Sequence, residues 1–250
     1  MGEEMKKLFI TTILISLYLL CSNVEAAVNY TYSTPKNYDY NKNTTIDSSQ
    51  EKILFIVDFS NSMNEKMGHR TKLDVALSTM QQILQLIPQN VNVGLRVYGH
   101  KTGFTPRQSC SASTLVAPIQ PNNAINVYKE LKSTNAVGWT PITYSLKQAI
   151  FSDFAGFTGK KRIILISDGG ENCDESPCDF VMDLLQYRDD INIDVIALAV
   201  GDQDANNQLK CVALVTSGKF YNANTAADLK NSLEDSLRLQ KEVQAETINK

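Results

Sequence analysis

Carboxylate and hydroxyl side chains follow a run of β-forming residues in the stretch ILFIVDFSNSM, residues 53–63. Asp58 ends the run, and Ser60 and Ser62 occupy the next alternate positions. An acidic residue at the end of a buried strand costs desolvation free energy unless something compensates it, and alternate side chains of an extended segment point the same way. A metal ion is one candidate for that compensation.

Two further polar residues occupy matching places in the sequence. Asp168 in RIILISDGGE ends another apolar run, and Thr140 in AVGWTPI precedes a predicted helix. In open α/β sheets, sites form outside the carboxyl ends of the strands, so these side chains are expected at one rim. Three hydroxyls and two carboxylates form an all-oxygen set, which suits Mg²⁺, or alternatively Mn²⁺ or Ca²⁺, with a coordination position left for an outside ligand.

The elements that must position these residues alternate between strand and helix. Apolar residues recur at helical spacing from Leu73 to Ile87 and stop before Pro88. Strands are predicted at residues 52–57, 91–98, 114–117, 162–167, 193–200 and 219–221, and further helices at 124–131, from 140 onward and at 226–246. This order predicts an α/β fold with a doubly wound, mostly parallel, Rossmann-like central sheet flanked by helices and one antiparallel edge strand.

The composition excludes one class of partner. A chain of 250 residues, 43% hydrophobic and 20% charged, is long enough for one well-packed globular domain with short extensions. The net charge is −3, and the lysines and arginines are scattered, so there is no basic stripe of the kind that nucleic-acid binding needs. We therefore expect no nucleic acid among the partners.

The N-terminal segment has the features of an export signal. Two lysines precede the apolar run LFITTILISLYLLC, which is too short to span a bilayer as an ordinary helix, and Val24–Ala26 has small residues where signal peptidase reads. Cleavage would remove residues 1–26, leave the mature chain without a transmembrane anchor, and place it in the periplasm or outside the cell. Lipidation at Cys21 is the less favoured alternative, because Leu20 is bulkier than lipoprotein signals usually allow.

The rest of the chain divides into three parts. Residues 27–49 are rich in Asn, Tyr, Thr, Lys and Ser without an apolar period, which is typical of a flexible linker. Residues 50–240 form the predicted globular domain, and residues 241–250 form a C-terminal tail.

Four cysteines remain after the predicted cleavage: Cys110, Cys173, Cys178 and Cys211. An even number in an oxidising compartment favours two disulfides, whereas the C-x4-C spacing with distant single cysteines is not a zinc pattern. Three pairings are possible. Cys178–Cys211 with Cys110–Cys173 is slightly favoured, because the local pair Cys173–Cys178 would close a small loop with less entropic benefit.

Three motifs together resemble a known site. The D-F-S-N-S of residues 58–62, the G-W-T-P-I of residues 138–142 and the S-D-G-G-E of residues 167–171 are similar, in order and spacing, to the metal-ion-dependent adhesion site of von Willebrand factor type A domains. The resemblance runs from Lys52 to Leu239. The stretch R-V-Y-G-H and the paired cysteines further resemble an exported bacterial branch of this family.

The resemblance implies a complete site and a role for each residue. It implies that Ser60 and Ser62 hold the ion directly and that Asp58 holds it directly or through water. Thr140 corresponds to the threonine whose contact with the metal changes with ligand state, and Asp168 to the aspartate bonded to a metal-bound water. The resemblance also implies a protein-binding module, for adhesion or complex assembly, in which an Asp or Glu carboxylate of the partner completes the ion's shell.

An enzyme is the alternative interpretation, as a metal-dependent hydrolase or phosphatase using Asp58. A phosphatase nucleophile is usually followed by a second aspartate two residues later, where Ser60 stands. The sequence has no G-x-S-x-G elbow and no glycine-rich phosphate loop. A third interpretation, a cytosolic chelatase-like subunit with the same domain, conflicts with the predicted export signal. We therefore expect a binding protein without catalytic residues.

Structural roles remain the simplest interpretation of several single residues. Asp58 or Asp168 alone would be expected to cap a helix, and only the combination of motifs favours a metal. Trp139 and His100 stand near the predicted rim, where packing is the more common role for such residues. Glu171 is interpreted as a loop or helix-start residue.

Overall fold

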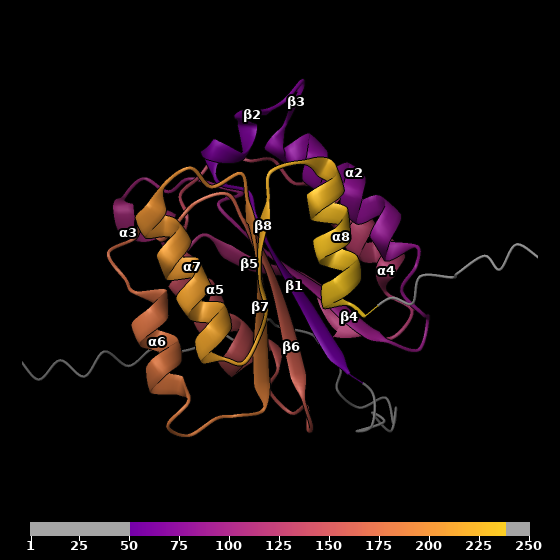
Figure 1. Ribbon diagram of the computed structural model, residues 1–250. Helices are drawn as coiled ribbons and strands as arrows, with labels where there is room; N and C mark the ends of the chain where they lie inside the picture. The colour runs from indigo at the N-terminus through magenta and orange to yellow at the C-terminus, as the bar shows by residue number, and fades with distance from the viewer. Residues whose placement is uncertain (1–50, 239–250) are drawn as a thin grey trace, which may run out of the picture. The chain divides into compact units, whose positions relative to one another are not determined.

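The computed structural model describes residues 51–238 (Figure 1). The predicted signal peptide at 1–26, the linker at 27–49 and the tail at 241–250 lie outside the described residues. Within the described part of the chain, no helix is long and apolar enough to cross a membrane.

A six-stranded sheet follows the apolar runs of the sequence. Its strands are β1 (Lys52–Asp58), β4 (Asn92–Tyr98), β5 (Ser113–Gln120), β6 (Lys161–Ser167), β7 (Ile191–Leu198) and β8 (Phe220–Ala223). They lie in the order β5-β4-β1-β6-β7-β8, and every pair is parallel except β4 with β5. The predicted fold class, with its antiparallel edge strand, is confirmed.

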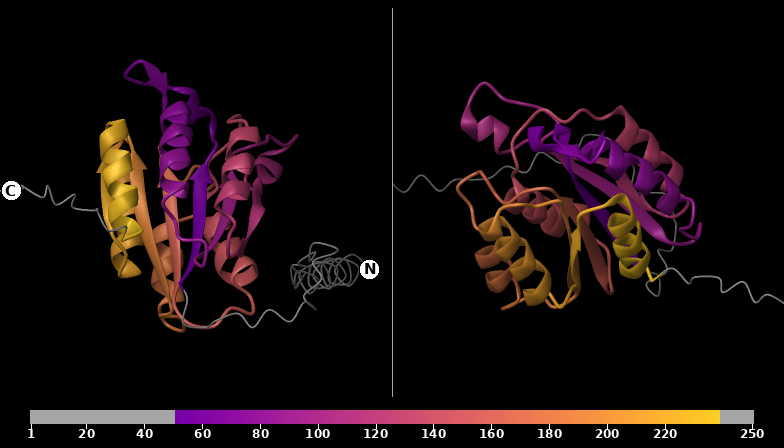
Figure 2. Two further views of the ribbon diagram at one scale, coloured as in Figure 1. Left: turned by 90° about the vertical axis from the view of Figure 1, so that its right-hand side faces the viewer. Right: turned by 45° about the horizontal axis from the view of Figure 1, so that its top comes forward.

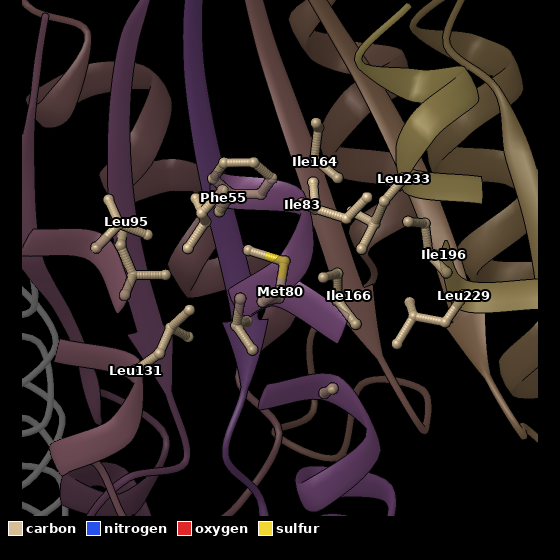
Figure 3. Packing of buried hydrophobic residues seen from close by; sticks show 14 of the residues in the cluster. Phe55, Met80, Ile83, Leu95, Leu131, Ile164, Ile166, Ile196, Leu229 and Leu233 are labelled. Atoms are coloured by element: carbon tan, nitrogen blue, oxygen red, sulfur yellow. The ribbon is translucent and has the colours of Figure 1, made fainter. Parts of the chain in front are cut away.

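Helices cover both faces of the sheet, because its central strands are apolar on both sides (Figure 2). One face carries α2 (Lys72–Leu84), α4 (Ala124–Ser133) and α8 (Ala226–Ser236), and the other carries α5 (Ile142–Gln148), α6 (Pro177–Leu184) and α7 (Gln203–Val215). On the first face, Met80 of α2 and Leu229 of α8 pack with Phe55 of β1 and other buried side chains (Figure 3).

Several short elements stand outside this alternation. They are the 3-10 turn η1 (Asn61–Asn64), the hairpin strands β2 (Lys66–Met67) and β3 (Arg70–Thr71), the short helix α3 (Pro106–Ser109) and the π-helical turn η2 (Ala149–Asp153). The sequence pattern predicts none of them, because an element of two to five residues is too short to show a period.

Several boundaries differ from the sequence prediction, by one to three residues in most strands and most clearly in three helices. The helix predicted to run to Ile87 ends at Leu84. The last helix ends at Ser236 rather than at residue 246, because Arg238 has a positive φ of 52°, which a continuing helix excludes. Pro141 stands at the N-cap of α5 rather than inside its first turn.

Two disulfides connect the segments that follow the strands. Cys110–Cys173 joins the end of α3 to the loop after β6, and Cys178–Cys211 joins α6 to α7, each with a Cα–Cα distance of 5.5 Å. Of the three possible pairings, this is the one that the sequence slightly favours. The bridges therefore tie together loops and helices that leave the same side of the sheet.

We expect removal of the second bridge to lower stability without changing the fold. The double variant Cys178→Ala, Cys211→Ala frees a loop with a sequence separation of 33 residues, which corresponds to about 3–4 kcal/mol of unfolding free energy. Chemical denaturation of the variant and the wild type measures the difference, after non-reducing peptide mapping of the wild type. An unchanged denaturation midpoint, or free thiols in the mapped protein, would contradict the assignment.

Candidate metal site

Asp58 lies at the carboxyl edge of the sheet between two neighbouring strands. The register pairs it with Tyr98 at the end of β4, and Ser167 ends the other neighbour, β6. Its Oδ2 accepts hydrogen bonds from Tyr98 Oη at 3.0 Å and Ser167 Oγ at 2.8 Å, while its Oδ1 accepts one from the backbone N–H of Ser60 at 2.6 Å. Asp58 is fully buried, so the strand ends themselves provide the polar contacts of this carboxyl group.

The electrostatic environment of Asp58 is unfavourable for a bare negative charge. Burial and, after it, the nearby negative charge of Asp168 raise the pKa of Asp58 to about 6, against hydrogen bonds from Ser60 and Ser167 that lower it. A cation close to the carboxyl group would offset both the cost of burying its charge and the repulsion by Asp168.

The two serines connect this strand end to Asp168. Ser60 Oγ and Ser62 Oγ lie 3.0 Å apart, and Ser62 Oγ donates to Asp168 Oδ1 at 2.8 Å. The side chain of Asp168 is fully buried, and Ser62 is half-buried. The structure therefore brings four of the five predicted metal-site residues, Asp58, Ser60, Ser62 and Asp168, into one group, which we call the rim cluster.

Backbone geometry explains why Ser60 can lie so close to its neighbours. A Cβ on Gly99, which has a φ of +70°, would lie 2.5 Å from the N atom of Ser60. A Cβ on Gly138 would lie 2.6 Å from the carbonyl oxygen of Lys101. Glycine at both positions therefore permits three segments of the chain to converge at the rim.

Thr140 lies beside the rim cluster and is held there by its backbone. Its segment runs next to Ser60 through the parallel bridge between Ser60 and Gly138, and the N–H of Asn61 donates to the Gly138 carbonyl at 3.0 Å. The N–H of Thr140 donates to Asn172 Oδ1 at 2.7 Å. Within residues 51–238, the hydrogen bonds of Thr140 are made by its backbone, so its side chain is buried at the rim without a bond to the cluster.

A lysine that the sequence analysis did not single out contacts the rim cluster. Lys72 Nζ donates to Asp168 Oδ2 at 3.0 Å and to Glu65 Oε2 at 2.8 Å. The lysine side chain is 8% exposed. Its position at the start of an amphipathic helix is typical of a surface residue, so no sequence signal indicates this contact. Tyr98 and Ser167 were also missed, although Ser167 stands inside the S-D-G-G-E motif.

The three residues interpreted as structural have defined surroundings. Trp139 is 39% exposed beside Thr140. His100 Nε2 lies 3.1 Å from Thr114 Oγ1, and its buried Nδ1 has no partner within residues 51–238. Glu171 accepts hydrogen bonds from the N–H groups of Thr143 at 2.7 Å and Cys173 at 3.0 Å, so it caps the start of α5, where Pro141 gives no side-chain cap.

The donor set of the rim cluster fits a hard divalent ion better than a zinc centre of the histidine and cysteine type. Within residues 51–238, no group of three or more His, Cys, Asp and Glu side chains is placed to hold a metal. An ion at the rim would therefore depend on the serine hydroxyls together with the buried carboxylates, which is oxygen chemistry. Asp58 is enclosed by hydrogen bonds on both oxygens, which is a poor placement for a nucleophile.

Similar proteins share the sequence or the fold. The chain is 28% identical over 190 residues to the uncharacterized protein YwmD of Bacillus subtilis (strain 168), covering 73% of this chain and 83% of that protein. The structure of proximal thread matrix protein 1 from the mussel byssus, with a zinc-occupied MIDAS motif, has a TM-score of 0.58 and 18% identity, covering 76% of this chain and 45% of that chain. The present chain thus spans less than half the length of the mussel protein.

A bacterial pilus protein has the same fold. The von Willebrand factor domain of the type V pili tip protein Mfa5 from Porphyromonas gingivalis matches with a TM-score of 0.56 and 15% identity, over 77% of this chain and 97% of that chain. At these identities, the structural likenesses establish the fold.

The family assignment follows from the sequence profile. The profile described as von Willebrand factor type A domain matches residues 52–235, which include the whole sheet and the rim cluster. Domains of this family commonly bind a divalent metal, bind protein partners and are generally not enzymes. The chain belongs to the von Willebrand factor type A domain family.

Proposed function

We propose that this protein binds a partner protein through a divalent ion at the rim cluster, in adhesion or in the assembly of a complex. Ser60, Ser62 and Asp58 would hold the ion, with Asp168 and Thr140 contributing from the adjacent loops. Mg²⁺ is the preferred ion, with Mn²⁺ or Ca²⁺ as alternatives. When bound, the ion supplies an electrophilic centre that an Asp or Glu carboxylate of the partner can complete.

The observation that carries this proposal is the buried pair of carboxylates at the sheet edge, with the hydroxyls of Ser60 and Ser62 beside them. Asp58 ends strand β1, and Asp168 directly follows the neighbouring strand β6. The hydroxyl of Ser60 lies 3.0 Å from that of Ser62, which donates a hydrogen bond to Asp168. Lys72 balances the charge of Asp168, so the second negative charge remains costly in a buried place without a further cation. Hydroxyl ligands add no charge of their own, so an ion held here keeps its attraction for an outside carboxylate.

The loops around the cluster would determine which partner binds. Residues 64–71, 101–113 and 174–179 leave the same edge of the sheet as the cluster. Phe104, in the second of these loops, is fully exposed, and Trp139 is partly exposed next to Thr140. Exposed aromatic side chains next to a metal site supply contact area that a carboxylate alone lacks.

We also infer that the protein works after export, in the periplasm or outside the cell. Its two disulfides support this proposal, because disulfides persist in oxidising compartments and are rare in reducing ones. Lipid anchoring through Cys21 remains the less favoured route, and that residue lies outside the described part of the chain.

We expect divalent ions to stabilise the folded protein through Ser60. A ligand that binds only the folded state stabilises it by about 2.7 kcal/mol at one hundred times its dissociation constant, which corresponds to a rise in Tm of roughly 5–10 °C for a domain of this size. Ser60→Ala should abolish that rise, and Asp168→Asn should weaken ion affinity by about ten- to a hundredfold. Thermal unfolding with Mg²⁺, Mn²⁺ or EDTA measures both effects.

A matched serine provides the control for this experiment. Ser111 is exposed, and its Oγ donates to the backbone carbonyl of Gln108, away from the rim cluster. Ser111→Ala should therefore keep the full ion-dependent rise in Tm. If calorimetry detects no divalent binding to the wild type at millimolar ion, even with a carboxylate-bearing peptide present, the metal-site proposal is wrong.

Ion binding should weaken in acid because protons compete for Asp58. The pKa of Asp58 in the ion-free folded protein is about 6, above its ordinary value of 3.8, so the folded state binds this proton more tightly than the unfolded chain does. The ion-free protein accordingly loses stability from this group as pH rises from about 4 to about 6. Ion affinity should be about tenfold weaker near pH 5 than near pH 7.5. Titration calorimetry at the two pH values tests this expectation, and equal affinities would contradict it.

Partner capture should depend on the ion and on Ser60 together. Crosslinked pull-downs from the native compartment should recover a partner with the wild type in Mg²⁺, but not in EDTA and not with Ser60→Ala. Blocking the carboxylates of the captured partner should release it. Turnover of ester or phosphate substrates by the pure protein, lost in Asp58→Asn, would instead support the enzyme alternative.

A further inference from the structure

We propose that Lys72 is a built-in counter-cation of the rim cluster, which weakens the binding of a divalent ion alone and strengthens the preference of the occupied site for an acidic partner. This inference rests on the proposed metal-dependent function. It assigns a specificity-determining role to a residue outside the motifs that identify the site.

The chain places Lys72 by a compact local structure. Residues 65–72 fold back through the hairpin β2–β3, which stands at the edge of the sheet where β1 ends (top of Figure 1). The backbone N–H of Lys72 donates to the carbonyl of Glu65 at 2.9 Å, and its Nζ donates to the carboxylate of the same residue. Thr71 and Asp74 form a capping box that fixes the start of α2. Lys72 is therefore held at both its backbone and its side chain.

The two carboxylate partners of Lys72 differ in their surroundings. The side chain of Asp168 is fully buried, whereas that of Glu65 is 66% exposed. Burial lowers the pKa of Lys72, but the hydrogen bonds that its ammonium donates to Glu65 and Asp168 outweigh this effect, so the pKa lies above its ordinary value and the ammonium is charged at neutral pH. The pair with Asp168 is thus a desolvated ion pair, while Glu65 lies on its solvent side.

Asp168 stands between the ammonium and the serines. Its Oδ1 faces Ser62 and its Oδ2 faces Lys72. A divalent ion at the serines would share this carboxylate with the lysine, and the two cations would repel each other through a poorly screened environment. Lys72 must therefore reduce the affinity of the site for the ion.

The repulsion between Lys72 and the ion affects the net charge of the occupied site, and through it the binding of an acidic partner. Asp58 and Asp168 as carboxylates contribute two negative charges, and Lys72 cancels one of them, while the charge of Glu65 is largely screened because its side chain is 66% exposed. A divalent ion then leaves the occupied cluster with one net positive charge, whereas the same cluster without the lysine would be neutral. Net positive charge in a partly buried site attracts an anionic ligand. Ion and acidic partner are thereby expected to bind in a mutually dependent way.

Two substitutions that remove charges of opposite sign next to the rim cluster test the proposal. In titrations with Mn²⁺ near neutral pH, Lys72→Met should bind the ion about tenfold more tightly than the wild type, because the repelling charge is gone. Glu65→Gln removes an exposed carboxylate next to Lys72, so it should bind the ion a few-fold more weakly. Lys147→Met is the matched control, since Lys147 pairs with Glu175 at 2.7 Å away from the rim cluster and should leave the affinity unchanged.

Two further measurements separate an electrostatic role from a structural one. Without ion, Lys72→Met leaves Asp168 short of a partner and should lower Tm, but Mn²⁺ should restore more stability to this variant than to the wild type. Acetate, as a simple carboxylate probe, should bind to the Mn²⁺-loaded variant more weakly than to the loaded wild type, as followed by water-proton relaxation.

The outcomes distinguish this inference from the function on which it rests. If the wild type binds no Mn²⁺, the proposed function fails and the counter-cation role fails with it. If the wild type binds Mn²⁺ but Lys72→Met binds it equally or more weakly, the lysine merely positions Asp168 and this inference alone is overturned. Should Lys72→Met not fold, Glu65→Gln decides: unchanged or tighter binding refutes the proposal.

Discussion

The buried carboxyl group of Asp58 is the constraint to which the rest of the rim conforms. A carboxyl group with no exposed surface must find its hydrogen bonds within the protein. The parallel register supplies them, because Tyr98 and Ser167 end the strands on either side of β1. The turn after Asp58 supplies the third through the N–H of Ser60. The same contacts that satisfy Asp58 therefore bring the serines of the turn to the centre of the sheet edge.

The loops that surround this centre are fastened to one another as well as to the strand ends. Cys110–Cys173 links the loop after α3 to the loop after β6. In the second of these loops, Asn172 holds the N–H of Thr140, and Glu171 caps the start of α5. A disulfide beside these two contacts limits how far the Thr140 segment can move away from the serines. The rim thus combines hydrogen-bonded strand ends with loops whose separation is restricted by a disulfide.

Sequence reasoning succeeds where a property repeats or a motif is local. The apolar runs at β1, β6 and β7 predict a buried parallel sheet, and two of the three motifs contain the side chains that meet at its edge, whereas Thr140 of the third lies beside them. The contacts of Lys72 and Tyr98 are different in kind, because each depends on the exact distance between segments far apart in the chain. The sequence around a lysine at a helix start, or around a tyrosine in an apolar strand, does not predict such a contact. The end of α8 at Ser236 was also unpredictable from periodicity, since apolar residues continue beyond the point where the backbone turns.

Interior charges serve two purposes in this fold, as the buried pairs of Arg96 and Lys72 show. Arg96 and Asp153 are almost fully buried and make a two-pronged contact at 2.6 and 2.7 Å, which satisfies both charges and joins β4 to η2. Lys72 and Asp168 make a single contact, and the second oxygen of Asp168 faces the serines. In the first pair both carboxylate oxygens contact the arginine, so another ion would have to break the pair before binding. The second pair leaves one carboxylate oxygen directed at the rim cluster, and a charge added there changes the free energy of the lysine as well. A site with this arrangement responds to the sum of the charges placed in it, so in the proposed function the ion and an acidic ligand would be parts of one equilibrium.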